Sequence, residues 1–344
     1  MGGRFVAWLL MVACAACGGG GSGGPTDDNS IKPPPNGVAQ FTALPVDISR
    51  TPLLTPLGNL NPPGHTLPTD HVYFYQTNFA VFPVVPATAV LPVYAATTGA
   101  VNFMLQPAGT DWKIGFIATK DFGYYYDHLV PLPNIKVGTV VQAGEQVGTT
   151  TPGGAFDLGA YDLRVSHTGF VNPVRYGEQT LHYVSPWAYF VEPLRSQLYA
   201  KVRRHPSAAD KDGKIDFGVA GRLVGDWFEQ SVPNSTEASG PAGWPKSLAF
   251  VYDYYDPRQI RVVIGGTIAP VGVWTIPAGA PGPETVSVSS GKVAYRLMYT
   301  ESFTVQSGLM LVQMVTSDRI KVEVFTGSQA GDAEFTAAAF MYVR

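Results

Sequence analysis

The stretch from Gly64 to Tyr75, "GHTLPTDHVYFY", gathers two histidines and an aspartate around a proline. Imidazole nitrogens and carboxylate oxygens are ligands that zinc takes in proteins, and a catalytic zinc needs three of them plus an open position for water. His65, Asp70 and His71 are therefore candidates for part of a metal site. The alternative is structural: His65 as a solvent-exposed loop residue and His71 as the polar first residue of the strand "HVYFY".

Further candidates lie about 60 to 90 residues on, in "YYDHL" and "FDLGAYDLRV". His128 follows a run of tyrosines and is either a site residue or a hydrogen-bonded rim residue. Period-two alternation places Ala160, Asp162 and Arg164 on one face of an expected strand. Asp162 is accordingly either a metal ligand or the partner of Arg164 in an ion pair. Asp157 is a further candidate ligand.

The order of these pieces resembles the lysostaphin- or LytM-type zinc metallopeptidases, which cleave peptidoglycan cross-bridges on a duplicated β-hairpin scaffold. The resemblance covers roughly residues 64–190. Its most specific part is "KVGTVVQAGEQVGTTT", which is similar to the family's G-x-x-V-x-x-G-x-x-I-G segment. The glycines of this segment permit tight turns between paired strands.

The resemblance implies a role for each matching residue. His65 and Asp70 would be zinc ligands, although they are five residues apart where the family has four. His128 would be the catalytic histidine that stabilises the transition state. The family's His-x-His strand is matched here by Ala160 and Asp162, so that Asp162 would be the third ligand.

These two departures predict weak chemistry. Two carboxylates neutralise the charge of a zinc ion, so its bound water is acidified less than with one carboxylate. Ala160 supplies no base, a contribution that is typically worth 10²–10⁴-fold in rate. We therefore expect zinc to bind weakly or not at all, and the domain to be non-catalytic.

Composition narrows the class of protein. Of 344 residues only 14% are charged and the net charge is −3, which gives no footprint for nucleic acid. The chain has 45% hydrophobic residues, 38 glycines and 29 prolines. Short β-branched and aromatic runs alternate with turn residues throughout, which predicts an all-β protein.

The N-terminus resembles a bacterial lipoprotein signal. Residues 1–17 hold Arg4, a short apolar run, and cysteines at Cys14 and Cys17, either of which could be lipidated. An ordinary secretory signal cut near Ala16 is the alternative. Residues 18–40 are a Gly/Ser/Pro linker. We expect an exported protein, anchored by lipid to the membrane of a bacterial envelope, in the outer membrane or periplasm. These cysteines are the only two in the chain, so the exported part has no cysteine-based site.

Two domains follow the linker. Residues 41–203 form the peptidase-like duplicated-hairpin β domain. Residues 204–344 are expected to form an antiparallel β-barrel, with a tight hairpin at Ser317-Asp318. The triplet at 225–227, Gly-Asp-Trp, is similar to the Gly-x-Trp of lipocalin-like barrels. "DKDGKID" (210–216) is expected to be a boundary turn rather than a calcium loop, because Gly221 stands where an EF-hand needs glutamate.

The leading hypothesis is an envelope lipoprotein whose first domain binds peptidoglycan or regulates a cell-wall protein. Two alternatives stay open. The first domain could be an active zinc endopeptidase that cleaves peptidoglycan cross-links, or the barrel could hold a small apolar ligand.

Overall fold

The computed structural model describes residues 35–78, 87–152, 155–301, 304–327 and 332–344. Cys14, Cys17 and the lipoprotein signal lie outside the described residues. The chain divides into a unit of residues 1–32 and a unit of residues 33–344, and everything below concerns the second. No helix among the described residues combines the length and apolarity that a membrane crossing requires.

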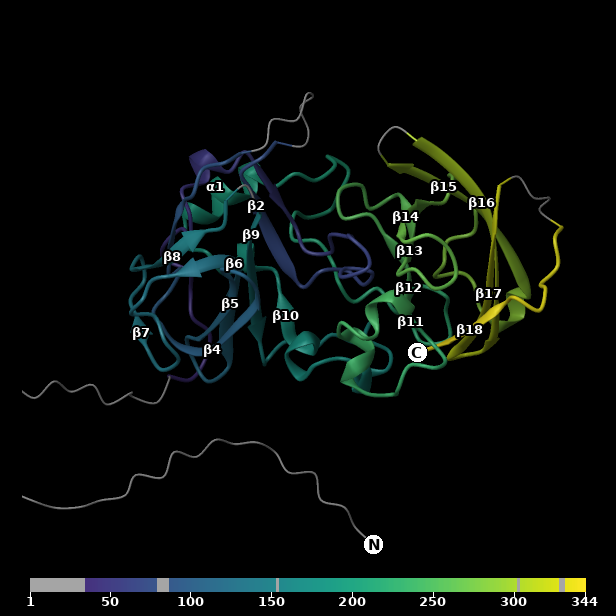
Figure 1. The fold of residues 1–344 in the computed structure, drawn as a ribbon, viewed down its shortest axis with the longest axis horizontal. Coiled ribbons are helices and arrows are strands. Elements are labelled where there is room, and N and C mark those ends of the chain that lie inside the picture. Colours follow the sequence, from purple (N-terminus) through teal and green to yellow (C-terminus); the bar gives the residue numbers. More distant parts are fainter. Residues whose placement is uncertain (1–34, 79–86, 153–154, 302–303, 328–331) are drawn as a thin grey trace, which may run out of the picture. The chain divides into compact units, whose positions relative to one another are not determined.

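The N-terminal half of this unit is a ten-stranded sheet (Figure 1). Its main path runs β1-β2-β9-β6-β5-β4-β7, with β8 beside β6, β3 beside β8, and β10 beside β9. All of these pairings are antiparallel. The strands are β1 (Leu53–Thr55), β2 (His71–Tyr75), β3 (Pro92–Tyr94), β4 (Gly99–Ala108), β5 (Asp111–Ile117), β6 (Phe122–Pro131), β7 (Val140–Val141), β8 (Gln146–Thr150), β9 (Ala155–Asp162) and β10 (Tyr183–Val184).

The strands β2, β6 and β9 are buried over most of their length, as expected for strands inside the sheet. Val72 and Phe74 of β2, and Leu158 of β9, are fully buried in one core. Residues of the opposite parity point to the other face of a strand. The glycine turns also form as expected, since Gly138 and Gly144 have φ of +91° and +79°, which favours glycine.

The C-terminal half forms a closed antiparallel barrel in which eight strands pair in chain order. They are β11 (Gly225–Glu229), β12 (Ser247–Tyr252), β13 (Ile260–Ile264), β14 (Gly272–Thr275), β15 (Lys292–Glu301), β16 (Thr304–Thr316), β17 (Arg319–Thr326) and β18 (Phe340–Val343). Ser317 and Asp318 form the two-residue link between β16 and β17. The predictions of an all-β protein and of an antiparallel barrel are confirmed.

Apolar side chains from all eight strands fill the barrel interior, with Trp227 fully buried among them. The indole nitrogen of Trp227 donates to the carbonyl of Leu223 at 2.7 Å. The guanidinium of Arg344 lies 3.8 Å from the centre of the Trp227 ring and donates to the carbonyls of Val219 and Arg222. Trp227 therefore sits where the first and last strands of the barrel meet.

Helices contribute little. One α-helix, α1 (Leu194–Lys201), follows the sheet. The 3₁₀ helices are η1 (Ile48–Arg50), η2 (Pro173–Arg175), η3 (Glu178–His182), η4 (Pro186–Tyr189), η5 (Thr236–Ser239), η6 (Trp244–Lys246) and η7 (Val288–Ser290). Several of these turns lie where sheet and barrel touch. Thr66 donates its hydroxyl to the carbonyl of Trp244 at 3.3 Å, and the Tyr176 hydroxyl donates to Asp226 at 2.9 Å.

Candidate functional site

A cavity of about 400 Å³ opens over β2, β5, β6 and β9, and it holds most of the residues that the sequence analysis singled out. Five carboxyl groups and one lysine line it together with three histidines: Asp70, Asp111, Asp127, Asp157, Asp226, Lys113, His65, His71 and His128. Trp244 and Ser239 close it from the barrel side. This lining makes the cavity acidic and gives it both hydrogen-bond donors and acceptors.

A β-bulge on β6 brings two neighbouring side chains into this cavity. Tyr126 pairs with Ile114 and Leu129 with Trp112, so Asp127 and His128 together face the single residue Lys113. His128 has φ of +63°, which is costly for a residue with a Cβ. Without the bulge, strand alternation would send one of the two side chains to the opposite face.

His71 is held by three neighbours. Its Nδ1 lies 2.9 Å from Asp70 Oδ1 and 3.0 Å from the Tyr125 hydroxyl, and its Nε2 lies 2.9 Å from the Tyr73 hydroxyl. The Tyr125 hydroxyl also donates to Asp70 Oδ1 at 2.8 Å. The ring of His65 packs edge-on against His71 at 5.2 Å between centroids. Both nitrogens of His71 are thus occupied by protein groups.

Asp157 is the buried centre of the group, with 2% of its surface exposed. Its Oδ2 lies 3.4 Å from His71 Nε2 and 3.5 Å from His128 Nε2, whereas its Oδ1 has no hydrogen-bond partner. Burial raises the pKa of Asp157 to about 6; the two histidines oppose this shift and nearby Asp127 adds to it. Asp157 is therefore a carboxyl group that can take up a proton near neutral pH.

The other groups of the site titrate according to their neighbours. Burial, together with the nearby His71, lowers the pKa of His65 to about 4, so this imidazole is neutral at pH 7. Burial alone would raise the pKa of Asp70, but hydrogen bonds from His71 and Tyr125 and the charge of Lys113 hold it below its ordinary value. Burial lowers the pKa of His128, and the surrounding carboxylates outweigh it, so the net pKa is raised.

Asp162, expected as the third zinc ligand, lies elsewhere. It ends β9, five positions after Asp157, and an odd spacing along a strand points the two side chains to opposite faces. Arg164 donates to its carboxylate from Nε and Nη2 at 3.0 and 3.1 Å, and the Tyr189 hydroxyl donates to the same carboxylate at 3.1 Å. The expected strand over 160–165 is also displaced, because β9 runs from Ala155 to Asp162 and Arg164 follows in a turn. Asp162 therefore has the ion-pair role that the sequence left open.

The residues present do not fit the zinc site that the resemblance implies. On β9 the register partner of His71 is Gly159, which has no side chain to offer. A Cβ built there would lie 2.1 Å from the ring of Tyr125, so that ring leaves no room for a side chain at position 159. The Tyr125 hydroxyl in turn engages Asp70. Asp70 is thus engaged by His71 and Tyr125, and Asp162, the third ligand that the resemblance implies, does not line the cavity.

A different trio lies at the rim of the same cavity. Among the described residues, Asp111, Asp127 and His128 have one potential ligand atom each within 4.8 Å of one another. His128 Nδ1 already lies 2.9 Å from Asp111 Oδ2, and the Lys113 ammonium is 3.6 Å from Asp127 Oδ2. This trio could hold a divalent cation only if the lysine moved aside.

The sequence analysis found His65, Asp70 and His128 but missed Asp111, Lys113 and Asp127. The signal for Asp127 was its position directly before His128. Neighbouring side chains of a regular strand point to opposite faces, and only a bulge turns both toward the cavity. Asp111 and Lys113 lie on β5, the strand paired with the "YYYDH" strand, and their alternation around Trp112 marks one face of it.

No protein-family model matches the chain, and no curated protein matches it. Solved structures are similar to part of it, among them the following three. Csd3 of Helicobacter pylori has 18% identity over 36% of this chain and 32% of its own, with a TM-score of 0.27. A zinc-containing peptidase from Vibrio cholerae has 16% identity over 36% of this chain and 37% of its own, with a TM-score of 0.26. This chain thus spans about a third of the length of either structure.

The third structure is a mutant of the catalytic domain of the prophage-encoded M23 protein EnpA from Enterococcus faecalis. It has 16% identity over 42% of this chain and 95% of its own, with a TM-score of 0.27. The similarity to each of the three structures covers less than half of this chain.

Proposed function

We propose that this protein is an envelope lipoprotein whose sheet half is a non-catalytic, peptidase-like module that binds the peptide part of peptidoglycan in the acidic cavity. The observation that carries the proposal is the Tyr125 ring over Gly159. That ring leaves no room for a side chain at position 159, and Asp162, the expected third ligand, does not line the cavity, which is large enough for part of a peptide.

The lining favours a ligand that carries an amino group. Five carboxyl groups face one lysine, and that lysine is partly neutralised by Asp127 at 3.6 Å and by the Tyr125 ring, whose centre is 3.8 Å from the ammonium. Asp111 and Asp127 are only partly buried, with 29% and 19% of their side chains exposed, so they can be reached from solvent. An ammonium group would be attracted by this field and could donate to both carboxylates.

The test is co-sedimentation of the purified mature protein with peptidoglycan sacculi, together with an assay for released soluble peptides. We expect the protein to pellet with the sacculi and to release nothing, equally with added zinc and with a chelator. Asp111→Asn and Asp127→Asn should each weaken binding about tenfold, which corresponds to about 1.4 kcal/mol. Glu178→Gln, which removes an exposed carboxylate outside the cavity, is the matched control and should bind like the wild type.

Two outcomes would contradict the proposal. Failure to pellet would remove the binding function. Zinc-dependent release of peptides that is lost in His65→Ala or His128→Ala would favour the alternative of an active endopeptidase. That alternative draws on one observation, the convergence of Asp111, Asp127 and His128. A divalent cation bound there would supply a Lewis acid and an acidified water.

A further inference from the structure

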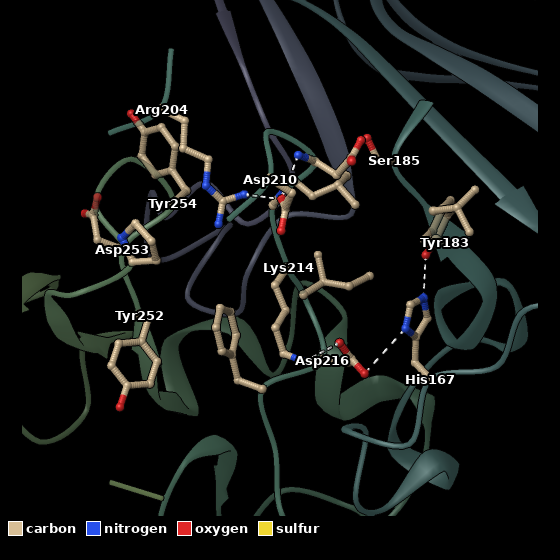
Figure 2. Close-up of a pocket in the computed structure, with 17 residues that line it drawn as sticks. His167, Tyr183, Ser185, Arg204, Asp210, Lys214, Asp216, Tyr252, Asp253 and Tyr254 are labelled. Carbon is tan, nitrogen blue, oxygen red and sulfur yellow. Dashed lines mark hydrogen bonds and ion pairs between the residues drawn. The ribbon is translucent and has the colours of Figure 1, made fainter. Parts of the chain in front are cut away.

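A second cavity, of about 440 Å³, is distinct from the acidic cavity (Figure 2). Most of its lining comes from three chain segments: residues 183–185, the crossing segment 204–217, and the β12–β13 turn around Tyr254. Leu57 and His167 complete it. Its wall combines four aromatic residues with charged ones; the aromatic residues are Tyr183, Phe217, Tyr252 and Tyr254. Only Ile215 contributes to the lining of both cavities.

Arg204 is the unusual group in this cavity. Its side chain is only 8% exposed, and its one hydrogen bond among the described residues runs from Nη1 to Asp210 Oδ1 at 2.9 Å. Nε is buried with no partner. A guanidinium has five N–H donors, and burying donors without acceptors costs free energy. Figure 2 shows the guanidinium extending toward Asp210, across the cavity from Ser185.

The same chain shows what the unused edge of this guanidinium can do. Arg164 holds the carboxylate of Asp162 with Nε and Nη2 at 3.0 and 3.1 Å. Arg258 holds Asp256 with the same two atoms, both at 2.8 Å. This Nε–Nη2 edge matches the two oxygens of a carboxylate. Arg204 is bonded through Nη1 instead, so its Nε–Nη2 edge, the fork of this guanidinium, has no protein carboxylate as a partner.

The carboxylates of the cavity are already occupied. Asp253 accepts from Arg261 Nε at 2.8 Å, and Asp212 accepts from the Tyr199 hydroxyl at 2.7 Å. Asp216 lies 3.2 Å from the Lys214 ammonium and 3.4 Å from His167 Nδ1. Arg204 therefore lacks a hydrogen-bond acceptor in this cavity, whereas the carboxylates already have donors.

Ser185 gives a second, independent observation. Its hydroxyl oxygen is buried and has no hydrogen-bond partner, although the residue is only 9% exposed. Like the Arg204 fork, it can donate to an oxygen atom. We propose that this cavity binds a small organic acid, with its carboxylate on the Nε–Nη2 edge of Arg204, a second oxygen atom that accepts from the Ser185 hydroxyl on the other side of the cavity, and its apolar body beside the tyrosine and phenylalanine rings.

The experiment measures binding of N-acetylphenylalanine and of its neutral amide to the full-length protein by calorimetry. We expect saturable binding of the acid, weakened by salt, and little binding of the amide. Arg204→Lys keeps the charge but loses the fork, and it should weaken binding about tenfold or more. Arg203→Gln is the matched control, because Arg203 stacks on Tyr255 outside the cavity; it should change binding less than about twofold.

Ser185→Ala separates ligand binding from folding. Because this hydroxyl has no partner in the protein, its removal should leave the thermal midpoint unchanged or raised while it weakens binding of the acid severalfold. Absence of saturable binding up to about 10 mM, a range that covers weak millimolar ligands, would overturn the proposal. Equal binding of acid and amide, or an Arg204→Lys protein that binds like the wild type, would do the same. None of these results bears on the peptidoglycan proposal, because neither Arg204 nor Ser185 lines the acidic cavity.

Discussion

At the scale of single residues, Asp157 and Asp162 show how position on one strand sets the chemistry of a carboxyl group. Asp157 is buried between two histidines, has one oxygen without a partner, and has its pKa raised to about 6. Burial would also raise the pKa of Asp162, but hydrogen bonds from Arg164 and Tyr189 hold it below its ordinary value. The first carboxylate therefore destabilises the fold and the second stabilises it.

The substitution of asparagine at each position tests this contrast. The folded pKa of Asp157 exceeds the unfolded one, so the native state binds more protons between about pH 4 and pH 6, and its stability falls as pH rises through that window. Asp157→Asn should remove this loss and stabilise the protein by about 1–3 kcal/mol at pH 7, with no gain at pH 4. Urea unfolding at both pH values measures the effect.

Asp162→Asn is the matched control from the same strand and has the opposite sign. Its folded pKa is lowered, so its contribution is present above the unfolded pKa and is lost in acid. The variant should lose about 1–3 kcal/mol at pH 7 through weakened charged hydrogen bonds. If both variants lost stability at pH 7, Asp157 would be a stabilising carboxylate and the account of its burial would be wrong.

At the scale of elements, the bulge on β6 is what builds the acidic cavity. It turns Asp127 and His128 to the same side and opposes them to Lys113 on β5. The positive φ of His128 is the conformational cost of this arrangement, about 1–2 kcal/mol for a residue with a Cβ.

Glycine at position 128 should relieve that cost. Both His128→Ala and His128→Gly remove the imidazole, so the difference between them reports on the backbone alone. We expect the glycine variant to be the more stable by about 1 kcal/mol in urea unfolding. At Met298, an exposed position within β15, the order should be reversed, with alanine the more stable. If alanine were the more stable variant at both positions, the bulge would have to relax when the histidine is absent.

At the scale of the whole molecule, residues of the barrel half take part in the core of the sheet half. Phe228, Val232 and Ala238 belong to the cluster that includes Phe74 and Leu158. Phe228 also packs under the guanidinium of Arg175 at 5.1 Å. Residues 33–344 accordingly form one compact unit.

This shared core predicts cooperative unfolding. For residues 33–344, circular dichroism and tryptophan fluorescence should report coincident urea transitions. A fragment of residues 204–344 should still form the barrel, because its interior is filled by its own strands, but it should be less stable by about 2–4 kcal/mol because Phe228 and Val232 become exposed. A fragment as stable as the intact unit would show that the shared core contributes nothing.

Local sequence patterns were sufficient to predict the all-β class, the antiparallel barrel and its Ser317-Asp318 hairpin, because alternation and turn chemistry are local properties. The sequence also singled out His65, Asp70 and His128, which line one cavity. Tight turns at Gly138 and Gly144 were also expected from the glycines of the "KVGTVVQAGEQVGTTT" segment, and both residues have positive φ.

Which aspartate faces the cavity follows from tertiary contacts and could not be predicted from the sequence. Strand alternation has a period of two, so the choice between Asp157 and Asp162 depends on where β9 begins and how it pairs, and an error of one residue reverses the face. The bulge at His128, the Tyr125 ring over Gly159 and the open fork of Arg204 depend on contacts between segments far apart in the chain. Pairing register and long-range packing fixed these features, and no local pattern in the sequence encodes them.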